Sequence, residues 1–219
     1  MINSVLYPFA LLILIFLLYI GFSSSIKYSS KRIKILSLIA CITLSLRALS
    51  LFVLSLSKSM ILIYLSKPLV FLDFIGLSLA AVISVYIILR SDKFKFSYIS
   101  IFLFITIGFY IVLIILSPYS VQGMLEGYGF SINLKYIEYV YIFYILINTI
   151  FLTAACNMLN KDFIDKKGTV LIIIASIVSI VEILSVILGY RLLQEVIFMD
   201  IFWMIVFNYS TNKLKNREF

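Results

Sequence analysis

Residues 5–22 read VLYPFALLILIFLLYIGF, a run of 18 residues without a charged side chain. Such a run is long enough to cross about 30 Å of hydrocarbon as an α-helix. A basic cluster follows it closely, in KYSSKRIK at 27–34. No basic residue precedes the run, whereas a signal peptide begins with a positively charged segment. We therefore expect residues 5–22 to form a transmembrane helix whose far end carries the positive charge.

The whole chain has the composition of a protein that lies in lipid. Of its 219 residues, 63% are hydrophobic and 13% are charged, and the mean hydropathy is +1.17. Soluble domains are about 45–50% apolar and about 25% charged. The apolar runs are too long, and alternate too little, for a membrane β-barrel. We predict an all-α polytopic membrane protein, a single seven-helix bundle with spans at 5–22, 33–56, 67–89, 98–116, 136–158, 169–188 and 192–209. The turn between the last two spans is predicted at Gly189-Tyr190-Arg191.

The basic residues predict the orientation of this bundle. Of the 18 Lys and Arg residues, 13 fall on one side of the predicted membrane. The other side holds four, which are Lys58, Lys67, Lys135 and Arg191. Short cytoplasmic loops are enriched in Lys and Arg. We therefore expect the N-terminus outside and the C-terminus inside, in a multi-pass protein of the cell membrane.

Several classes of chemistry are excluded or disfavoured by the composition. The chain has no histidine, which excludes His-ligated haem, His-containing zinc sites and catalytic pairs that use histidine. Cys41 and Cys156 have no CxxC spacing, so we expect reduced thiols and no disulfide. Asp73 and Asp200 lack the Gly-Asp context of intramembrane aspartyl proteases. We predict no enzyme, no cofactor and no metal, and the net charge of +8 suits anionic lipid headgroups better than nucleic acid.

Charged side chains in or near the predicted spans are the main functional signal. Each costs about 2.5–3.5 kcal/mol at the centre of a helix on insertion scales. At about 1.5 Å per residue, four of them lie at similar depths in the outer half of the bundle, and the fifth lies at the outer interface. They are Arg47, Asp73, Glu182 and Asp200, with Glu138 at the interface.

Helical spacing indicates that these charges face other helices. Three of them, Arg47, Asp73 and Glu182, lie on stripes of small or polar residues, and such stripes pack against neighbouring helices. The stripes are Asp73, Gly76, Ala80 and Ser84; Thr43, Arg47, Ser50 and Ser57; and Ser176, Ser179 and Glu182. Because Arg47 and Asp73 lie on consecutive spans at similar depth, we predict an ion pair between them.

Two interpretations of the charges remain open. In the structural one, a buried pair and a few protonated acids only hold helices together. In the functional one, they line an outward-facing polar pocket that binds a ligand. The candidate ligand-binding residues are Arg47, Asp73, Glu138, Tyr141, Asn148, Glu182 and Asp200.

The connection at 117–135 is the only long one, and it holds Gly127 and Gly129 between aromatic residues. It either closes over an outer cavity or is a simple connector. Tyrosines follow it at the predicted outer headgroup level, where an aromatic belt is typical. They are Tyr136, Tyr139, Tyr141 and Tyr144.

The layout resembles the seven-helix membrane sensor region at the N-terminus of many prokaryotic histidine kinases. The shared features are the basic loop from Lys27 to Lys34, the aromatic outer loop from Tyr119 to Tyr136, the basic Lys166-Lys167-Gly168, a tight outer turn, and a basic tail. No kinase module follows Phe219, so the resemblance implies a separate protein that carries the output. It carries over no catalytic residue.

We therefore expect a sensor or receptor-like module, with a small-solute or proton-coupled transporter as the alternative. Transporters commonly break helices at the substrate site. Here Pro8 and Pro68 are expected at helix ends, and Gly76 and Gly108 are the glycines expected inside spans, which predicts continuous helices and favours sensing. The expected partners are the lipid bilayer and a separate cytoplasmic signalling protein or membrane partner. A homodimer stays open.

Overall fold

The structure, a computed structural model, describes residues 2–56, 59–89, 96–123, 130–161, 164–190, 193 and 195–215. The helices in this part of the chain are α1 (Ile2–Tyr28), α2 (Lys31–Leu56), α3 (Met60–Val70), α4 (Asp73–Leu89), α5 (Phe96–Leu116), α6 (Ile137–Met158), α7 (Lys166–Ile187) and α8 (Phe198–Lys215). Two short strands, β1 (Tyr119–Gly123) and β2 (Phe130–Leu134), stand between α5 and α6. The predicted all-α class is confirmed, with the addition of this hairpin.

Six helical segments in the described residues are long and apolar enough to cross a membrane. They are Leu6–Tyr28, Lys31–Leu56, Ile61–Leu89, Phe96–Leu116, Ile137–Met158 and Lys166–Ile187. Large apolar side chains face outward, with Phe104 75% and Ile115 73% exposed. A soluble protein buries such residues and exposes its charges. The chain is therefore a multi-pass membrane protein.

The helix α8 is not among these six segments, because it carries Asp200, Lys213 and Lys215. It packs against α1, α4 and α7, and most of its side chains are buried. A helix that is surrounded by protein can be more polar than one that faces lipid, because neighbouring helices supply partners for its polar groups. The position of α8 inside the bundle thus explains its lower hydropathy.

The third predicted span, 67–89, is not one continuous helix. It begins earlier, at Met60, and a turn at Phe71 and Leu72 divides it into α3 and α4. Pro68 lies inside the last turn of α3, where it has no N–H to donate and its ring crowds the preceding turn. The expectation of continuous helices is therefore wrong at this span. Pro8 also lies inside a helix, α1, and not at its end.

The seventh predicted span, 192–209, is shifted along the chain. The helix α8 begins at Phe198 and continues to Lys215. Gly189 makes the predicted turn after α7, with φ of +85°, a conformation that glycine adopts without a steric penalty. Arg191 and Leu192 lie outside the described residues. The described residues directly before α8, 195–197, are not helical, and Val196 and Ile197 among them are buried.

The predicted loop at 117–135 contains an antiparallel hairpin. Its strands pair from Tyr119 with Leu134 to Gly123 with Phe130, and Ile132 and Leu134 of β2 are buried against the bundle. Ser131 of β2 is buried as well, so three of the five residues of this strand are covered. The predicted loop glycines Gly127 and Gly129 lie outside the described residues.

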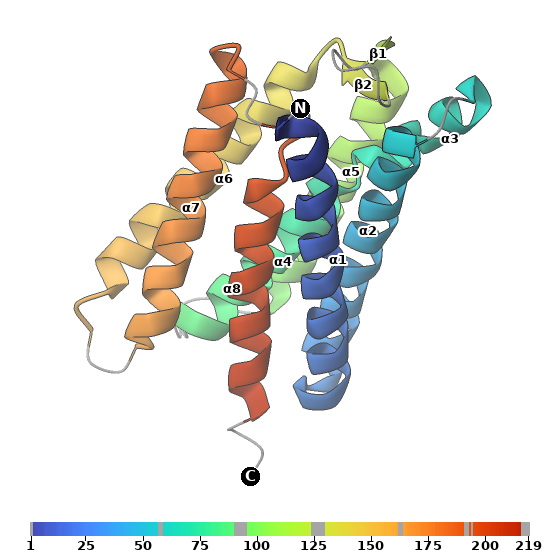
Figure 1. Cartoon of the computed structure of the whole chain (residues 1–219). Helices are drawn as coiled ribbons and strands as arrows, with labels where there is room; N and C mark the ends of the chain where they lie inside the picture. Colours follow the sequence, from blue (N-terminus) through green and yellow to red (C-terminus); the bar gives the residue numbers. More distant parts are fainter. Residues whose placement is uncertain are drawn as a thin grey trace.

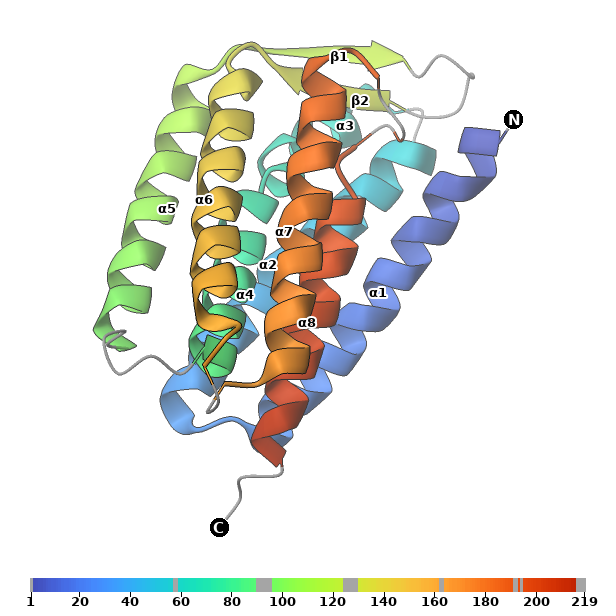
Figure 2. The same cartoon turned by 90° about the vertical axis from the view of Figure 1, so that its left-hand side faces the viewer.

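The bundle has two distinct ends. Figure 1 shows the N-terminus and the hairpin at one end, and the C-terminus at the opposite end. We call these the hairpin end and the C-terminal end. Figure 2 shows α5 at one edge of the bundle, with α1 at the other. The helix α4 lies inside, in contact with α2, α5 and α8, and nearly all of its side chains are buried.

Glycine permits the closest approach within this core. A Cβ built on Gly76 of α4 would lie 2.5 Å from Thr43 Oγ1 and 2.8 Å from Leu44 Cγ of α2. Small residues at helix contacts let backbones approach in this way. The predicted packing face of α4 is therefore confirmed. In contrast, no atom lies within 4 Å of a Cβ built on Gly108 of α5.

Candidate functional site

Arg47 of α2 lies at the centre of a buried cluster of charges. Its side chain is 3% exposed and forms ion pairs with Asp73, at 3.6 Å between Nη2 and Oδ2, and with Asp200. The predicted pair of Arg47 and Asp73 is confirmed. Asp200 was not expected as a partner of Arg47. The side chain of Asp200 is fully buried. Its pairing with Arg47 follows from the packing of α8 and could not be derived from the neighbouring residues in the sequence.

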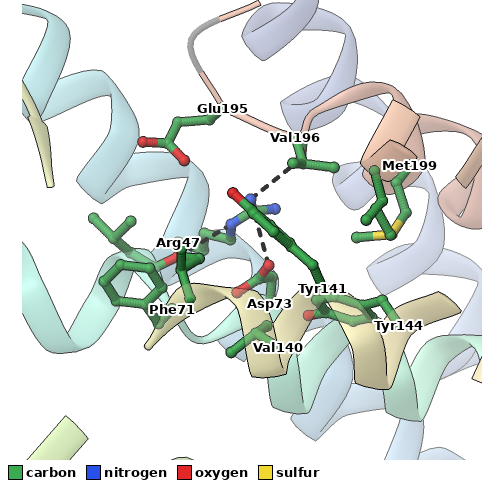
Figure 3. A pocket seen from close by; sticks show the side chains of 12 residues that line it. Arg47, Phe71, Asp73, Val140, Tyr141, Tyr144, Glu195, Val196 and Met199 are labelled. Atoms are coloured by element: carbon green, nitrogen blue, oxygen red, sulfur yellow. Dashed lines mark hydrogen bonds and ion pairs between the residues drawn. The ribbon is translucent and has the colours of Figure 1, made fainter. Parts of the chain in front are cut away.

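The guanidinium also satisfies the backbone at two places where helices are interrupted. Arg47 Nε donates to the Val70 carbonyl at 3.2 Å, and Nη2 donates to the Val196 carbonyl at 3.3 Å. Figure 3 shows the guanidinium between Asp73 and Val196. Val70 ends α3, and Val196 precedes α8. Non-helical backbone at membrane depth requires such partners, because lipid supplies none.

Both aspartates lie where a helix start favours negative charge. Asp73 is the first residue of α4, and Asp200 is in the first turn of α8. The N-terminus of a helix carries a partial positive charge of about half a unit. Arg47 thus joins the starts of two helices through their acidic first turns.

Glu182 of α7 caps the start of α8. Its Oε1 accepts hydrogen bonds of 3.1 Å from the backbone N–H groups of Ile197 and Phe198. Its Oε2 accepts one of 2.6 Å from the N–H of Met199. The first N–H groups of a helix have no partner inside the helix. A side chain of α7 therefore replaces the local cap that α8 lacks. We call Arg47, Asp73, Glu182 and Asp200 the charged junction.

A small cavity lies beside the charged junction. Its volume is about 20 Å³, and its polar lining comes from Arg47, Asp73, Tyr141, Tyr144 and Glu195. The other lining residues are Val70, Phe71, Ile137, Val140, Ile183, Val196 and Met199. A cavity of this size holds about one water molecule. No larger ligand fits into it in this conformation.

The tyrosines of α6 divide between the surface and this cavity. Tyr136 and Tyr139 are exposed, as the predicted aromatic belt requires. Tyr141 and Tyr144 line the cavity instead. In Figure 3 the rings of both lie beside Asp73. The hydroxyl of Tyr144 is buried and has no hydrogen-bond partner among the described residues.

The structure brings together most, but not all, of the predicted ligand-binding residues. Arg47, Asp73 and Tyr141 line the cavity, and Glu182 and Asp200 complete the junction. Asn148 instead accepts a hydrogen bond of 3.0 Å from Trp203 Nε1. Glu138 is exposed and does not line the cavity.

Sequence reasoning did not single out Glu195, which lines the cavity. Glu195 lies in the predicted span 192–209, and an acidic residue inside a predicted span is the pattern that could have identified it. The remaining polar stripes pack as expected. Ser176 and Ser179 of α7 are buried, and Ser179 also accepts from Trp203 Nε1, at 3.1 Å. Ser57 lies outside the described residues.

A second charged contact closes the C-terminal end of the bundle. Lys213 Nζ of α8 lies 2.6 Å from Asp165 Oδ2, just before α7, and the Tyr209 hydroxyl donates to the same oxygen at 2.9 Å. Burial raises the pKa of Asp165, but the hydrogen bonds from Lys213 and Tyr209 outweigh it, so that the pKa lies below its ordinary value. The contact fixes α8 to the start of α7.

The described residues contain no group of three or more His, Cys, Asp or Glu side chains placed to hold a metal ion. Cys41 is buried, Cys156 is exposed, and the two do not form a disulfide with each other. Comparison of the chain with protein-family models, with curated proteins and with solved structures found no match.

Proposed function

We propose that this chain is a seven-span sensor of a cell membrane, with its N-terminus outside and its C-terminus inside. In this proposal α3 and α4 together form the third span, and α8 is the seventh. The two chain ends lie at opposite ends of the bundle (Figure 1), which suits an odd number of crossings. The C-terminal end carries Lys27, Lys31, Lys166, Lys167, Lys213 and Lys215, and basic residues collect on the cytoplasmic side.

The observation that carries the sensor proposal is the way α8 is held at both ends. At its start, Glu182 caps the backbone and Arg47 pairs with Asp200. Near its finish, Lys213 and Tyr209 contact Asp165. A change at the charged junction therefore acts on the same helix that ends at the inner surface. A separate cytoplasmic signalling protein would contact the last turn of α8.

The charged junction is closed to solutes, which favours sensing over transport. The cavity beside it has room for about one water molecule. Toward the C-terminal end, the same helices present fully buried apolar side chains, which are Leu44, Ala80, Ala175, Met204 and Phe207. Transport would require this layer to open. Sensing requires only that the junction shift.

Proton-coupled transport is the second candidate, and two observations favour it. The third span is interrupted beside Asp73, as discontinuous helices are at transporter sites. The junction also holds three carboxylates against one guanidinium. The guanidinium balances one of the three negative charges, and the partial positive charges of two helix starts together balance about one more. About one negative charge is left, which a proton or a cation could balance.

The orientation is tested with two tags. We expect a reporter fused after Phe219 to be cytoplasmic, and a Gly123→Cys variant to be labelled from outside by an impermeant maleimide. The labelling uses a background in which Cys156 is replaced by serine. Tags that report the same side would contradict the three crossings proposed between Gly123 and Phe219, which are α6, α7 and α8.

Sensing and transport are separated by flux and by labelling. If the protein senses, the purified chain in liposomes carries no proton flux, and an Ala175→Cys variant resists water-soluble reagents from the inner side. Glu182→Gln instead changes the labelling rate of a cysteine placed at Asn212, an exposed residue of α8. Glu138→Gln, at an exposed acid away from the junction, serves as the control. Proton flux that is lost in Glu182→Gln, together with labelling at Ala175→Cys, would establish transport instead.

A further inference from the structure

An apolar groove of about 390 Å³ runs between α5 and α6 on the hairpin end of the bundle. Phe109, Val112, Leu113 and Leu116 line it from α5, and Tyr136 and Tyr139 line it from the start of α6. The helix α5 is held mainly by α4. In the described part of the chain, only its residues Ile99, Leu103 and Thr106 are buried. The groove therefore opens toward lipid.

We propose that this groove binds one anionic phospholipid of the outer leaflet, and that the charged junction responds to its occupancy. The assignment to the outer leaflet and the response rest on the proposed function. Binding itself depends only on the groove and on its position in a membrane.

The volume of the groove suits an acyl chain. Small-molecule sites occupy about 300–1,000 Å³, and the groove of about 390 Å³ lies in this range. A partner helix would pack against the open face of the groove and need not fit inside it, so the number of chains in the complex, measured below, distinguishes it from lipid.

One lysine gives the hairpin end of the groove a positive charge. The ammonium of Lys135 lies 5.8 Å from the centre of the Tyr136 ring, which lines the groove. Lys67 does not contribute, because its Nζ contacts the Ile114 carbonyl and the Tyr119 ring, and neither residue lines the groove. Glu138 is the nearby acid on α6, and it does not line the groove. A basic residue near a membrane surface attracts anionic headgroups.

A second apolar groove provides an internal comparison. It has a volume of about 480 Å³ and lies between α1 and α2, where Leu18, Phe22, Leu46 and Leu49 are among its lining residues. None of its lining residues is charged. We expect lipid to contact this groove without a preference for anionic headgroups.

Contacts between aromatic rings connect the proposed lipid site to the charged junction. Phe109, in the groove, stacks on Phe74 of α4 with ring centres 5.1 Å apart. The Phe74 ring lies 5.9 Å from that of Tyr144, which lines the cavity. Phe74 directly follows Asp73. An acyl chain that displaces Phe109 therefore acts on the side chain next to Asp73.

Lipid retention tests the binding. The full chain is reconstituted in nanodiscs of phosphatidylcholine with a small fraction of phosphatidylglycerol, extracted mildly, and weighed with its retained lipid by native mass spectrometry. We expect one phosphatidylglycerol per chain. Val112→Trp fills the groove and lowers retention about tenfold or more. Lys135→Gln lowers the preference for phosphatidylglycerol about fivefold.

Matched controls exclude general effects of tryptophan and of lost charge. Ile105→Trp is an exposed position of α5 outside the groove, and Leu46→Trp fills the other groove. Lys161→Gln removes an exposed lysine at the C-terminal end. None of these three variants should change retention. If Val112→Trp fails to fold, Leu116→Trp, at another exposed lining residue, takes its place.

Several outcomes would overturn the proposal. If Val112→Trp or Leu116→Trp retains as much lipid as the wild-type protein, the lipid binds outside the groove. If phosphatidylcholine is retained as well as phosphatidylglycerol, Lys135 has no role in binding. A mass of two chains without lipid makes the groove an interface between copies. If Glu182→Gln still changes the labelling rate of the cysteine at position 212 but no lipid is retained, only the lipid proposal is wrong. If lipid is retained but Glu182→Gln does not change that labelling rate, the proposed sensor function is wrong instead.

Discussion

The carboxylate of Glu182 on α7 accepts a hydrogen bond of 2.6 Å from the backbone N–H of Met199, in the first turn of α8. The same carboxylate also accepts from Ile197 and Phe198. The start of α8 is thus capped by a different helix, at a depth where water is scarce. This arrangement holds α8 in place and makes its position depend on α7.

Replacing Glu182 by glutamine should destabilise the protein by about 1–3 kcal/mol. The amide keeps one acceptor oxygen but turns an NH₂ group toward N–H donors, which leaves a buried donor without a partner. Unfolding in detergent, followed by loss of helical circular dichroism, measures the change. Glu138→Gln, at an exposed site on α6, should shift the free energy of unfolding by less than about 0.5 kcal/mol. An equal effect of the two variants would show that the cap contributes nothing.

Breaking the pairs of Arg47 should cost different amounts at its two partners. Asp200→Asn should destabilise by about 3–5 kcal/mol, because it removes a fully buried carboxylate that pairs with the buried guanidinium and leaves Asp73 as its one charged partner in the charged junction. Asp73→Asn should cost less, since its carboxylate is farther from Arg47 and is partly exposed. Combining Arg47→Met with Asp200→Asn should recover much of the loss. A double-mutant cycle measures the coupling, and additive losses would mean that the two side chains act independently.

Two glycines should respond oppositely to alanine. Gly76→Ala places a methyl group 2.5 Å from Thr43 Oγ1, and it should destabilise by about 1–3 kcal/mol as α2 and α4 separate. Gly108→Ala meets no atom within 4 Å and should stabilise by up to about 1 kcal/mol through higher helix propensity. Melting temperatures in one detergent compare the pair. A stable Gly76→Ala protein would contradict the close contact of α2 and α4.

Asp165 should make the stability of the C-terminal end depend on acid pH. Its pKa in the folded protein is lowered, since the hydrogen bonds from Lys213 and Tyr209 outweigh its burial. A carboxyl group with a lowered folded pKa stabilises above its unfolded pKa, about 3.9. That contribution is lost as the pH falls through the folded value.

The measurement is the difference in unfolding free energy between the wild-type protein and Asp165→Asn from pH 7 down to pH 3. The difference should be constant above about pH 5 and should shrink below pH 4. Replacing Lys213 by methionine should weaken this acid dependence, because Lys213 forms one of the hydrogen bonds that lower the pKa. An unchanged difference at pH 3 would contradict the contact.

Local properties of the sequence predicted much of this fold. Apolar runs such as 98–116 are long enough to span lipid by themselves, so their helices begin and end within a few residues of the predicted limits. Hydropathy measures the transfer of a segment into lipid, which depends on that segment alone. The pair of Arg47 and Asp73 followed from equal depth on consecutive helices, which is also a local property of each helix.

Only the tertiary structure decided where helices break and which charges meet. The interruption after Val70 is tolerated because Arg47 and Tyr110 donate to carbonyls at the end of α3. The late start of α8 is tolerated because Glu182 caps it. These partners lie on other helices, far away in the chain. Since buried backbone groups must be paired but the sequence does not specify by which residues, the packing of the bundle determined the interrupted span and the charged junction.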